Sequence, residues 1–266
     1  MEDKKRATIS VVINTLNAER IFEKCLESIK EADEIVVCDM HSEDKTIEIA
    51  QKYGCKICYH NRCTIVEPAR NYALSQATCD WVLVLDADEL VTPQLWQYLH
   101  NFADNPPQDT IALEIPRETY CLGQKLNSMY QSKLRRFWKR GACEYSDFVH
   151  VPPVTLYGKS THVKPRREGV AIQHYHIESL HSYVEKINRY TDFEMEKFVE
   201  KGTKFSVARL LLRPLFEFFK GYILKGGYKD GVCGFIICAM NMQYKFTQVA
   251  KLYEMEFKKK NPDLIY

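Results

Sequence analysis

Short β-branched runs alternate with amphipathic segments through the first hundred residues. We predict strands from the runs at residues 7–13, 34–38, 55–59 and 81–85. The amphipathic segments predict helices at residues 18–30, 45–53, 68–76 and 93–100. The run at residues 7–13 lacks regular apolar and polar alternation, which is typical of a strand covered on both faces. This order predicts an α/β fold with a doubly wound, mostly parallel sheet joined by right-handed crossovers.

Local signals mark the ends of two of these helices. Gly54 follows the second helix and is expected to close it as a C-cap. Thr92-Pro93 combines a capping hydroxyl with a proline at the first helical position. Ligands of such a sheet bind beyond the carboxyl ends of its strands, so we expect the functional side chains there.

The pattern weakens in the second half of the chain. Between residues 106 and 165, short strand-like pieces such as residues 110–115 are separated by proline, glycine and charged residues. This predicts a loop-rich segment that faces substrate. From residue 179 onward the pattern becomes helical again.

Composition narrows the class of protein. The 266 residues include 37 Lys+Arg and 35 Asp+Glu, a net charge of +2, and 45% of them are hydrophobic. These values are ordinary for a globular protein, and they argue against disorder and against a nucleic-acid partner. The polar start and the short apolar run at residues 9–13 predict neither a signal peptide nor a membrane span. Ten scattered cysteines predict reduced thiols and a cytoplasmic location.

Polar clusters follow three of the predicted strands. Residues 14–19 follow the first strand, Asp39 follows the second, and Asp86-Ala87-Asp88-Glu89 follows the fourth. Because parallel strands end at one edge of the sheet, we expect these clusters to lie together. Two carboxylates two residues apart repel unless a cation separates them, and Mg²⁺ is usually held by one or two carboxylates plus phosphate oxygens. The alternative is an acidic turn that only caps the next helix.

The clusters and their flanking strands resemble the inverting GT-A glycosyltransferases of family 2, in that family's order and spacing. The matching stretches are residues 9–19 (ISVVINTLNAE), 34–46 (EIVVCDMHSEDKT), 69–73 (ARNYA) and 81–89 (WVLVLDADE). Further stretches are similar to a bacterial branch that acts in lipopolysaccharide core synthesis, at residues 134–141, 174–175, 186–191, 212–215 and 221–231. The resemblance implies a GT-A fold, with a Rossmann-like, mostly parallel sheet flanked by helices and a C-terminal helical extension.

The resemblance also implies an activity and a division of the chain. The activity is transfer of a hexose from a nucleotide sugar, such as UDP-glucose, to a saccharide or lipid-linked saccharide acceptor. We expect a nucleotide-sugar-binding half at residues 1–115, an acceptor-side segment at residues 116–180 and a helical extension at residues 181–266.

Roles for single residues follow from the same resemblance. Thr15 and Glu19 are implied to contact the base and ribose, and Asp39 to hydrogen-bond the base, commonly uracil. Asp86 and Asp88 are implied to hold Mg²⁺ or Mn²⁺ bridging the diphosphate. Such a cation stabilises the charge that grows on the departing nucleotide.

Two further residues of the expected site carry alternatives. Arg70 is implied to approach the diphosphate or the base, and the alternative is a solvated helix residue paired with Glu67. His174 matches a His-Tyr position of the family and is a candidate metal ligand. A hydrogen-bonded structural histidine is the other interpretation.

The catalytic base is less clearly marked. An inverting transfer needs a group that removes the proton from the acceptor hydroxyl. Asp147 is our first candidate, His150 the second and Glu118 the third, and each also fits a turn or surface residue. The bacterial branch often shows Val-His-Glu where this chain has Val-His-Val at residues 149–151.

Two patterns lie outside this scheme. Cys55, Cys58, His60 and Cys63 have a zinc-like gap, but no second Cys-x-x-Cys pair accompanies them and a strand running into a loop has the same spacing. Residues 203–230 combine many large apolar residues with six Lys+Arg and two acids. This favours a peripheral membrane contact, and packing of the same face onto the catalytic domain is the alternative.

Two other functions compete with the transferase. A sugar-phosphate nucleotidyltransferase would need a glycine-rich phosphate loop after the first strand, and residues 14–17 contain no glycine. A nucleotide-sugar-binding module would keep the fold without a catalytic base.

Overall fold

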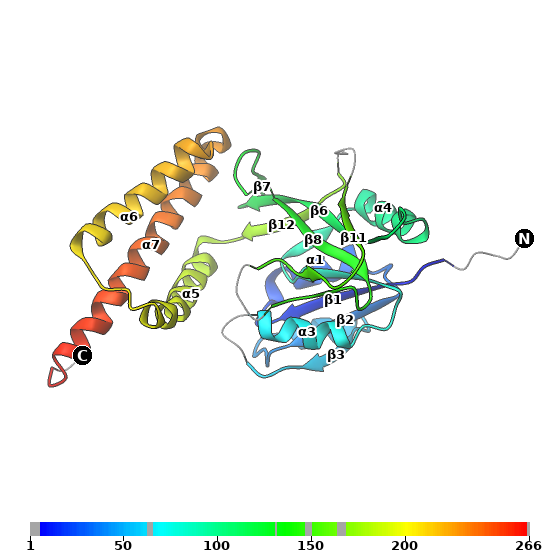
Figure 1. Cartoon of the computed structure of the whole chain (residues 1–266), viewed down its shortest axis with the longest axis horizontal. Helices are drawn as coiled ribbons and strands as arrows, with labels where there is room; N and C mark the ends of the chain where they lie inside the picture. Colours follow the sequence, from blue (N-terminus) through cyan, green and yellow to red (C-terminus); the bar gives the residue numbers. More distant parts are fainter. Residues whose placement is uncertain (1–5, 63–65, 131, 147–150, 164–168, 265–266) are drawn as a thin grey trace, which may run out of the picture. The chain divides into compact units, whose positions relative to one another are not determined.

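The computed structural model describes residues 6–62, 66–130, 132–146, 151–163 and 169–264. Contacts within the chain divide it into two compact units. The first comprises Met1–Glu118 and Ser132–His174, and the second comprises Thr119–Gln131 and Tyr175–Tyr266. Figure 1 shows helices and strands in the first unit and mainly helices in the second.

Four parallel strands form the first half of the main sheet. They are β1 (Ile9–Thr15), β2 (Glu34–Asp39), β3 (Lys56–Tyr59) and β4 (Trp81–Asp86), in the spatial order β3-β2-β1-β4. Every residue of β1 is buried, as expected for a strand covered on both faces. The predicted strands and their parallel arrangement are confirmed.

Helices follow these strands, and the two predicted end signals act where expected, although the last helix runs past the predicted end at residue 100. They are α1 (Glu19–Ser28), α2 (Thr46–Lys52), α3 (Glu67–Ser75) and α4 (Pro93–Asp104). Gly54 adopts the left-handed conformation with φ of 66° just after α2. The hydroxyl of Thr92 accepts a hydrogen bond from the backbone N–H of Leu95 at the start of α4.

The second half of the sheet corrects one prediction. It contains β5 (Glu89–Val91), β6 (Thr110–Cys121), β8 (Ser132–Lys139) and β12 (Ile172–Ile177), with shorter strands β7 (Gln124–Lys125), β9 (Cys143–Glu144), β10 (Val154–Thr155) and β11 (Lys159–His162). The main sheet runs β3-β2-β1-β4-β8-β6-β12-β5, and β8 lies antiparallel to β4 and β6. The described residues between 106 and 163 are therefore more strand than loop. Charged side chains that pair inside the fold interrupt the apolar pattern of β8, which hides it in the sequence.

The second unit is built mainly from helices, which confirms the predicted C-terminal extension. They are α5 (Leu180–Glu200), α6 (Val207–Phe219), the π-helical turn η1 (Lys220–Leu224), the 3₁₀ turn η2 (Gly227–Asp230) and α7 (Gly231–Lys260). No helix among the described residues combines the length and apolar character needed to cross a membrane. Buried Asp230 accepts hydrogen bonds from the backbone N–H groups of Asn127, Ser128 and Met129, and so fixes that loop on the helices.

Glycines allow the turns η1 and η2 to lie against α7. A Cβ atom added at Gly234 would stand 1.9 Å from the carbonyl oxygen of Gly227. A Cβ atom at Gly221 would stand 3.0 Å from the sulfur of Cys238. Any larger residue at Gly234 would therefore push the backbones apart.

Candidate active site

The three polar clusters lie together at one edge of the sheet. In the strand register, Thr15 is the partner of Asp39, and Asn14 is the partner of both Cys38 and Asp86. The ends of β1, β2 and β4 are therefore neighbours. This confirms the prediction that the clusters meet at the carboxyl edge.

Asp39 lies at the base of this edge and is fully buried. One carboxylate oxygen accepts hydrogen bonds from the hydroxyls of Thr15 and Ser42, at 2.8 and 2.6 Å. The other accepts from the backbone N–H of Ser42 at 2.8 Å. Three donors therefore hold the carboxylate in place, as a buried charge requires.

The loops after β1 and β2 are linked to each other. Asn17 has a φ of 51°, its N–H donates to the hydroxyl of Ser42, and its side-chain oxygen accepts from the N–H of Glu43. The carboxylate of Glu19 accepts from the backbone N–H of Lys45 at 3.0 Å. Thr15 and Asp39 end the strands that precede the two linked loops, and Glu19, the first residue of α1, helps to hold the loops together.

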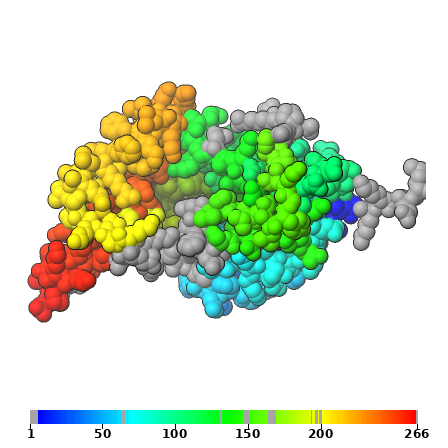
Figure 2. Space-filling view, viewed as in Figure 1, coloured from blue at the N-terminus to red at the C-terminus, as the bar shows by residue number. Residues whose placement is uncertain are grey.

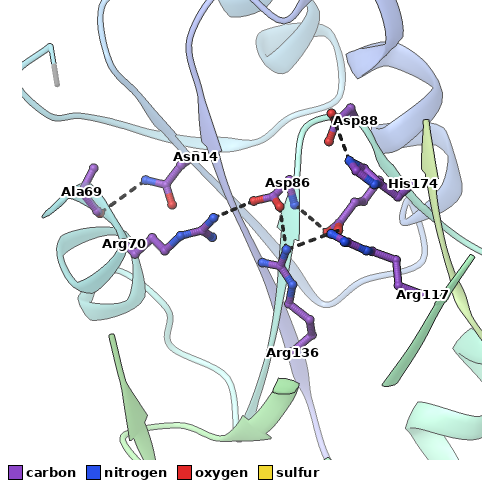
Figure 3. Close-up of polar contacts among 9 residues, drawn as sticks. Asn14, Ala69, Arg70, Asp86, Asp88, Arg117, Arg136 and His174 are labelled. Atoms are coloured by element: carbon purple, nitrogen blue, oxygen red, sulfur yellow. Dashed lines mark hydrogen bonds and ion pairs between the residues drawn. The ribbon is translucent and has the colours of Figure 1, made fainter. Parts of the chain in front are cut away.

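Asp86, at the end of β4, pairs with two arginines (Figure 3). Its two carboxylate oxygens accept from Arg70 at 2.8 Å and from Arg136 at 2.6 Å. Burial alone would raise the pKa of Asp86, but the two guanidinium groups hold that pKa well below its usual range. Asp86 is therefore an ionised carboxylate with both oxygens engaged.

Glu89 completes the charged cluster and is fully buried. It lies 3.2 Å from Arg136 and 3.7 Å from Arg117, and it accepts a hydrogen bond from the backbone N–H of Asp86. Burial raises the pKa of Glu89, the positive charge of Arg136 opposes that shift, and the negative charge of Asp86 adds to it. Sequence reasoning assigned no role to Arg136 or Arg117. The available signal was an arginine directly before the buried Phe-Trp pair of β8.

Arg70 lies inside the fold and not in solvent, with 8% of its surface exposed. The predicted alternative of a solvated helix residue is therefore wrong. Its guanidinium also lies over the ring of Tyr145, 5.0 Å from the centroid. One nitrogen of Arg70 and the side-chain oxygen of Asn14 are buried without a hydrogen-bond partner among the described residues. Buried polar atoms normally have partners, so this donor and this acceptor are available to a ligand.

Asp88 and His174 form a second group beside the first (Figure 3). The imidazole Nε2 of His174 lies 3.5 Å from a carboxylate oxygen of Asp88. His174 is mostly buried, whereas the side chain of Asp88 is 30% exposed. Strand pairing of β12 with β5 places His174 opposite Glu89. A carboxylate oxygen and an imidazole nitrogen are a donor set that fits Mn²⁺, and the carboxylate alone fits Mg²⁺.

These two side chains are what the described residues offer to a cation. Within the ranges that the structure describes, no group of three or more His, Cys, Asp or Glu side chains could hold a metal. Asp86 is the third predicted ligand, and its oxygens are bound by arginines. A cation here would therefore take its remaining ligands from substrate and water.

Of the three predicted bases, the structure describes only Glu118. Asp147 and His150 lie outside the described residues. Glu118 is half-buried on β6, directly after Arg117. Neighbouring strand residues point to opposite faces of a sheet, so Glu118 points away from the face on which Arg117 approaches Glu89. The identity of the base stays a prediction.

The cysteine cluster is partly described. Cys58 lies in β3 opposite Cys38 of β2, and Cys63 lies outside the described residues. Every cysteine that the structure describes is free of disulfide bonds.

Comparison with known proteins identifies the family. The family model described as glycosyl transferase family 2 matches residues 10–160, more than half of the chain. The chain belongs to this family. It is a glycosyltransferase, and with the sheet order β3-β2-β1-β4 its membership confirms the predicted GT-A fold.

Relatives of family 2 extend the likeness over nearly the whole chain. The lipopolysaccharide core biosynthesis glycosyltransferase LpsC of Rhizobium meliloti is 26% identical over 96% of this chain and 96% of its own. An uncharacterised glycosyltransferase of Rickettsia typhi is 26% identical over 95% of this chain and 89% of its own. The solved structure of glucosyl-3-phosphoglycerate synthase from Mycobacterium tuberculosis with Mn²⁺, UDP and glucosyl-3-phosphoglycerate aligns at 23% identity and a TM-score of 0.36. It covers 43% of this chain and 44% of that one, an overlap too small to inform on ligands here.

Proposed function

We propose that this family 2 enzyme transfers a hexose, with inversion, from a UDP-sugar to a saccharide acceptor and uses a divalent cation. The observation that supports this most is the convergence of Asp39, the Asp86 cluster and the Asp88–His174 pair at the edge of one sheet. Each group suits a different part of a nucleotide sugar. Membership of the family supports the reaction class, and the roles of the single residues are part of this proposal.

The nucleoside would bind at the linked loops after β1 and β2. Hydrogen bonds within the chain fix the side chains of Thr15 and Asp39. A preformed site loses little conformational entropy when its ligand binds. These loops, with the buried carboxylate of Asp39 fixed beneath them, would then contact the base.

The diphosphate would bind between Arg70 and the Asp88–His174 pair. The unpaired nitrogen of Arg70 is a ready donor for a phosphate oxygen. Asp88 and His174 would hold the cation, which stabilises negative charge on the leaving diphosphate. Asp86 would act through Arg70 and Arg136, since it orients both guanidinium groups.

The acceptor is proposed to be a lipid-linked saccharide of the cell envelope. LpsC, which is similar over 96% of its length, is named for lipopolysaccharide core biosynthesis. A lipid-linked acceptor would place the enzyme at the inner face of the cytoplasmic membrane. The base that deprotonates the acceptor hydroxyl is proposed to be Asp147 or His150.

Calorimetric titration with UDP tests the donor half of the proposal. In Mg²⁺ or Mn²⁺ we expect an affinity roughly tenfold or more above that in EDTA, because the cation neutralises diphosphate charge. Asp88→Asn should bind UDP weakly in both buffers, and the exposed Asp263→Asn should behave as the parent protein. UDP release from a panel of UDP-hexoses should require Asp88. Unchanged UDP affinity in EDTA together with full turnover by Asp88→Asn would contradict the proposal.

A further inference from the structure

The second unit exposes large apolar side chains along α6 and the turn that follows it. The six that define this apolar surface are Leu211, Leu212, Leu215, Phe216, Phe219 and Leu224. Each is between 50% and 77% exposed. Figure 2 shows α6 on the visible face of that unit, in yellow to orange. Monomeric soluble proteins rarely display so many neighbouring apolar groups without a partner.

Helical geometry shows that this surface is not the core-facing side of α6. Leu210, Pro214 and Phe218 repeat every four residues, Pro214 is buried, and Phe218 packs against the core of the unit. Residues 211, 215 and 219 form the next row, and residues 212 and 216 form the row after it. The helix therefore satisfies its core with one row and leaves two apolar rows outside.

Basic residues border the apolar rows. Arg209 and Arg213 form the adjoining row of α6, and Lys220, Lys225 and Lys229 follow in the turns after it. Glu217 is the one acidic residue between positions 207 and 229. Lys225 and Lys229 are exposed, and so the border of the apolar surface carries an excess of positive charge.

We propose that this apolar surface is a peripheral docking site for an anionic lipid bilayer. Apolar side chains would enter the boundary between headgroups and acyl chains, while the bordering cations contact lipid phosphates. α6 has 13 residues, which suits a helix lying in the plane of the interface and is too short for a span.

Charge argues for lipid over a second copy of the chain. A two-fold contact through this surface would bring its cationic borders toward each other, with a single acid on each copy, Glu217, which already pairs with Lys220, and such repulsion opposes association. An anionic bilayer satisfies both parts of the surface at once. Binding to vesicles needs neither donor nor acceptor. Its absence would therefore be distinguishable from an absence of the proposed sugar transfer.

Sedimentation of the full-length protein with vesicles tests the proposal. Vesicles of phosphatidylcholine are compared with vesicles that also contain phosphatidylglycerol, at low and high salt. Leu212→Glu with Phe216→Glu removes apolar contact, and Leu156→Glu, a 54% exposed leucine of the first unit, is the matched control. Lys225→Glu with Lys229→Glu reverses charge. Its control is Lys24→Glu with Lys159→Glu, two exposed lysines of the first unit.

We expect preferential binding to the anionic vesicles that weakens in salt. Each double variant of the surface should weaken it by roughly tenfold or more, since each lysine near an anionic surface contributes about a factor of five. The controls should bind as the parent protein. Equal loss in the controls, or no preference for anionic vesicles, would overturn the proposal. So would light scattering that shows a dimer, lost in Leu212→Glu with Phe216→Glu, without vesicle binding.

Discussion

At the sheet edge of the first unit charged side chains are buried, whereas on α6 of the second unit apolar side chains are exposed. Asp39 and Glu89 have no accessible surface, yet each has close polar partners. Leu212 and Leu224 are 65% and 77% exposed, and the core of their unit lies on the other side of the helix. Both regions depart from the usual distribution of polar and apolar residues.

The two regions differ in how many of their charged or apolar side chains have partners within the same unit. Most charges of the sheet edge are matched by charges of the same unit, and the atoms left over, on Arg70 and Asn14, suit a small polar ligand. The apolar surface has no match inside its unit and spans more than three helical turns. The size and polarity of the atoms that lack partners within their unit therefore indicate the kind of ligand that each region binds.

Removing a charge from the sheet edge should have the largest effect on stability. Arg136→Met leaves Asp86 and the buried Glu89 without their shared partner, and we expect a loss of about 3–5 kcal/mol in the free energy of unfolding. Denaturation in urea measures it. Arg140→Met, an exposed change just beyond the same strand, is the control. A loss no larger than in the control would mean that the cluster is not stabilising, and adding Glu89→Gln to Arg136→Met should recover part of the loss.

The pH dependence of stability should report on Asp86. Its pKa is lower in the folded protein than in the unfolded chain, so its stabilising effect is complete above about pH 4 and is lost as pH falls through the folded value. Asp86→Asn lacks this effect and should lose roughly 2–4 kcal/mol near neutral pH. The gap between parent and variant should narrow below about pH 4. Unfolding temperatures from pH 7 to pH 3 measure it, and a constant or widening gap would contradict the assignment.

A smaller change is expected where the charge is held by hydrogen bonds alone. Asp39→Asn replaces one accepting oxygen by a donor that faces Ser42 and Thr15, and should cost about 1–3 kcal/mol. It should also weaken UDP binding, as calorimetry measures. Ser42→Ala removes one of the three donors and should cost less than Asp39→Asn. The reverse order would show that Ser42 holds the loop by other contacts.

The smallest effect on stability is expected at the exposed surface. Leu212→Glu should change the free energy of unfolding by less than about 0.5 kcal/mol, because the side chain touches little of the protein. Phe218→Glu, on the core-facing row of the same helix, should cost far more. Thermal unfolding compares them. Similar losses for both would mean that Leu212 packs inside the molecule.

Elements set by local sequence could be predicted, and contacts between distant residues could not. The strand runs, Gly54 and Thr92 each act within a few residues, and the structure places them as expected. Arg136 meets Asp86 across 50 residues and Glu89 across 47, and no local pattern encodes that meeting. The same pairing gives β8 its buried arginine, which concealed the strand.

The sequence therefore predicted the carboxylates of the site but not their pairing with arginines. Asp39 and Asp86 end strands and Asp88 follows one, so all three could be placed at one edge by the rules of parallel sheets. Arg70 could be named, but its contact with Tyr145, which is far away in the chain, could not. The base remains a prediction, since both of its leading candidates lie outside the described residues.

The close approach of Gly234 to Gly227 bears on how the protein behaves between synthesis and membrane binding. The backbones of α7 and η2 lie in contact at this point, while the large leucines and phenylalanines of α6 stay exposed. A newly synthesised chain therefore exposes this apolar surface as soon as it folds. Chains whose apolar surface is not bound to lipid can aggregate through it. Detergent that covers this surface during purification should therefore keep the protein dispersed.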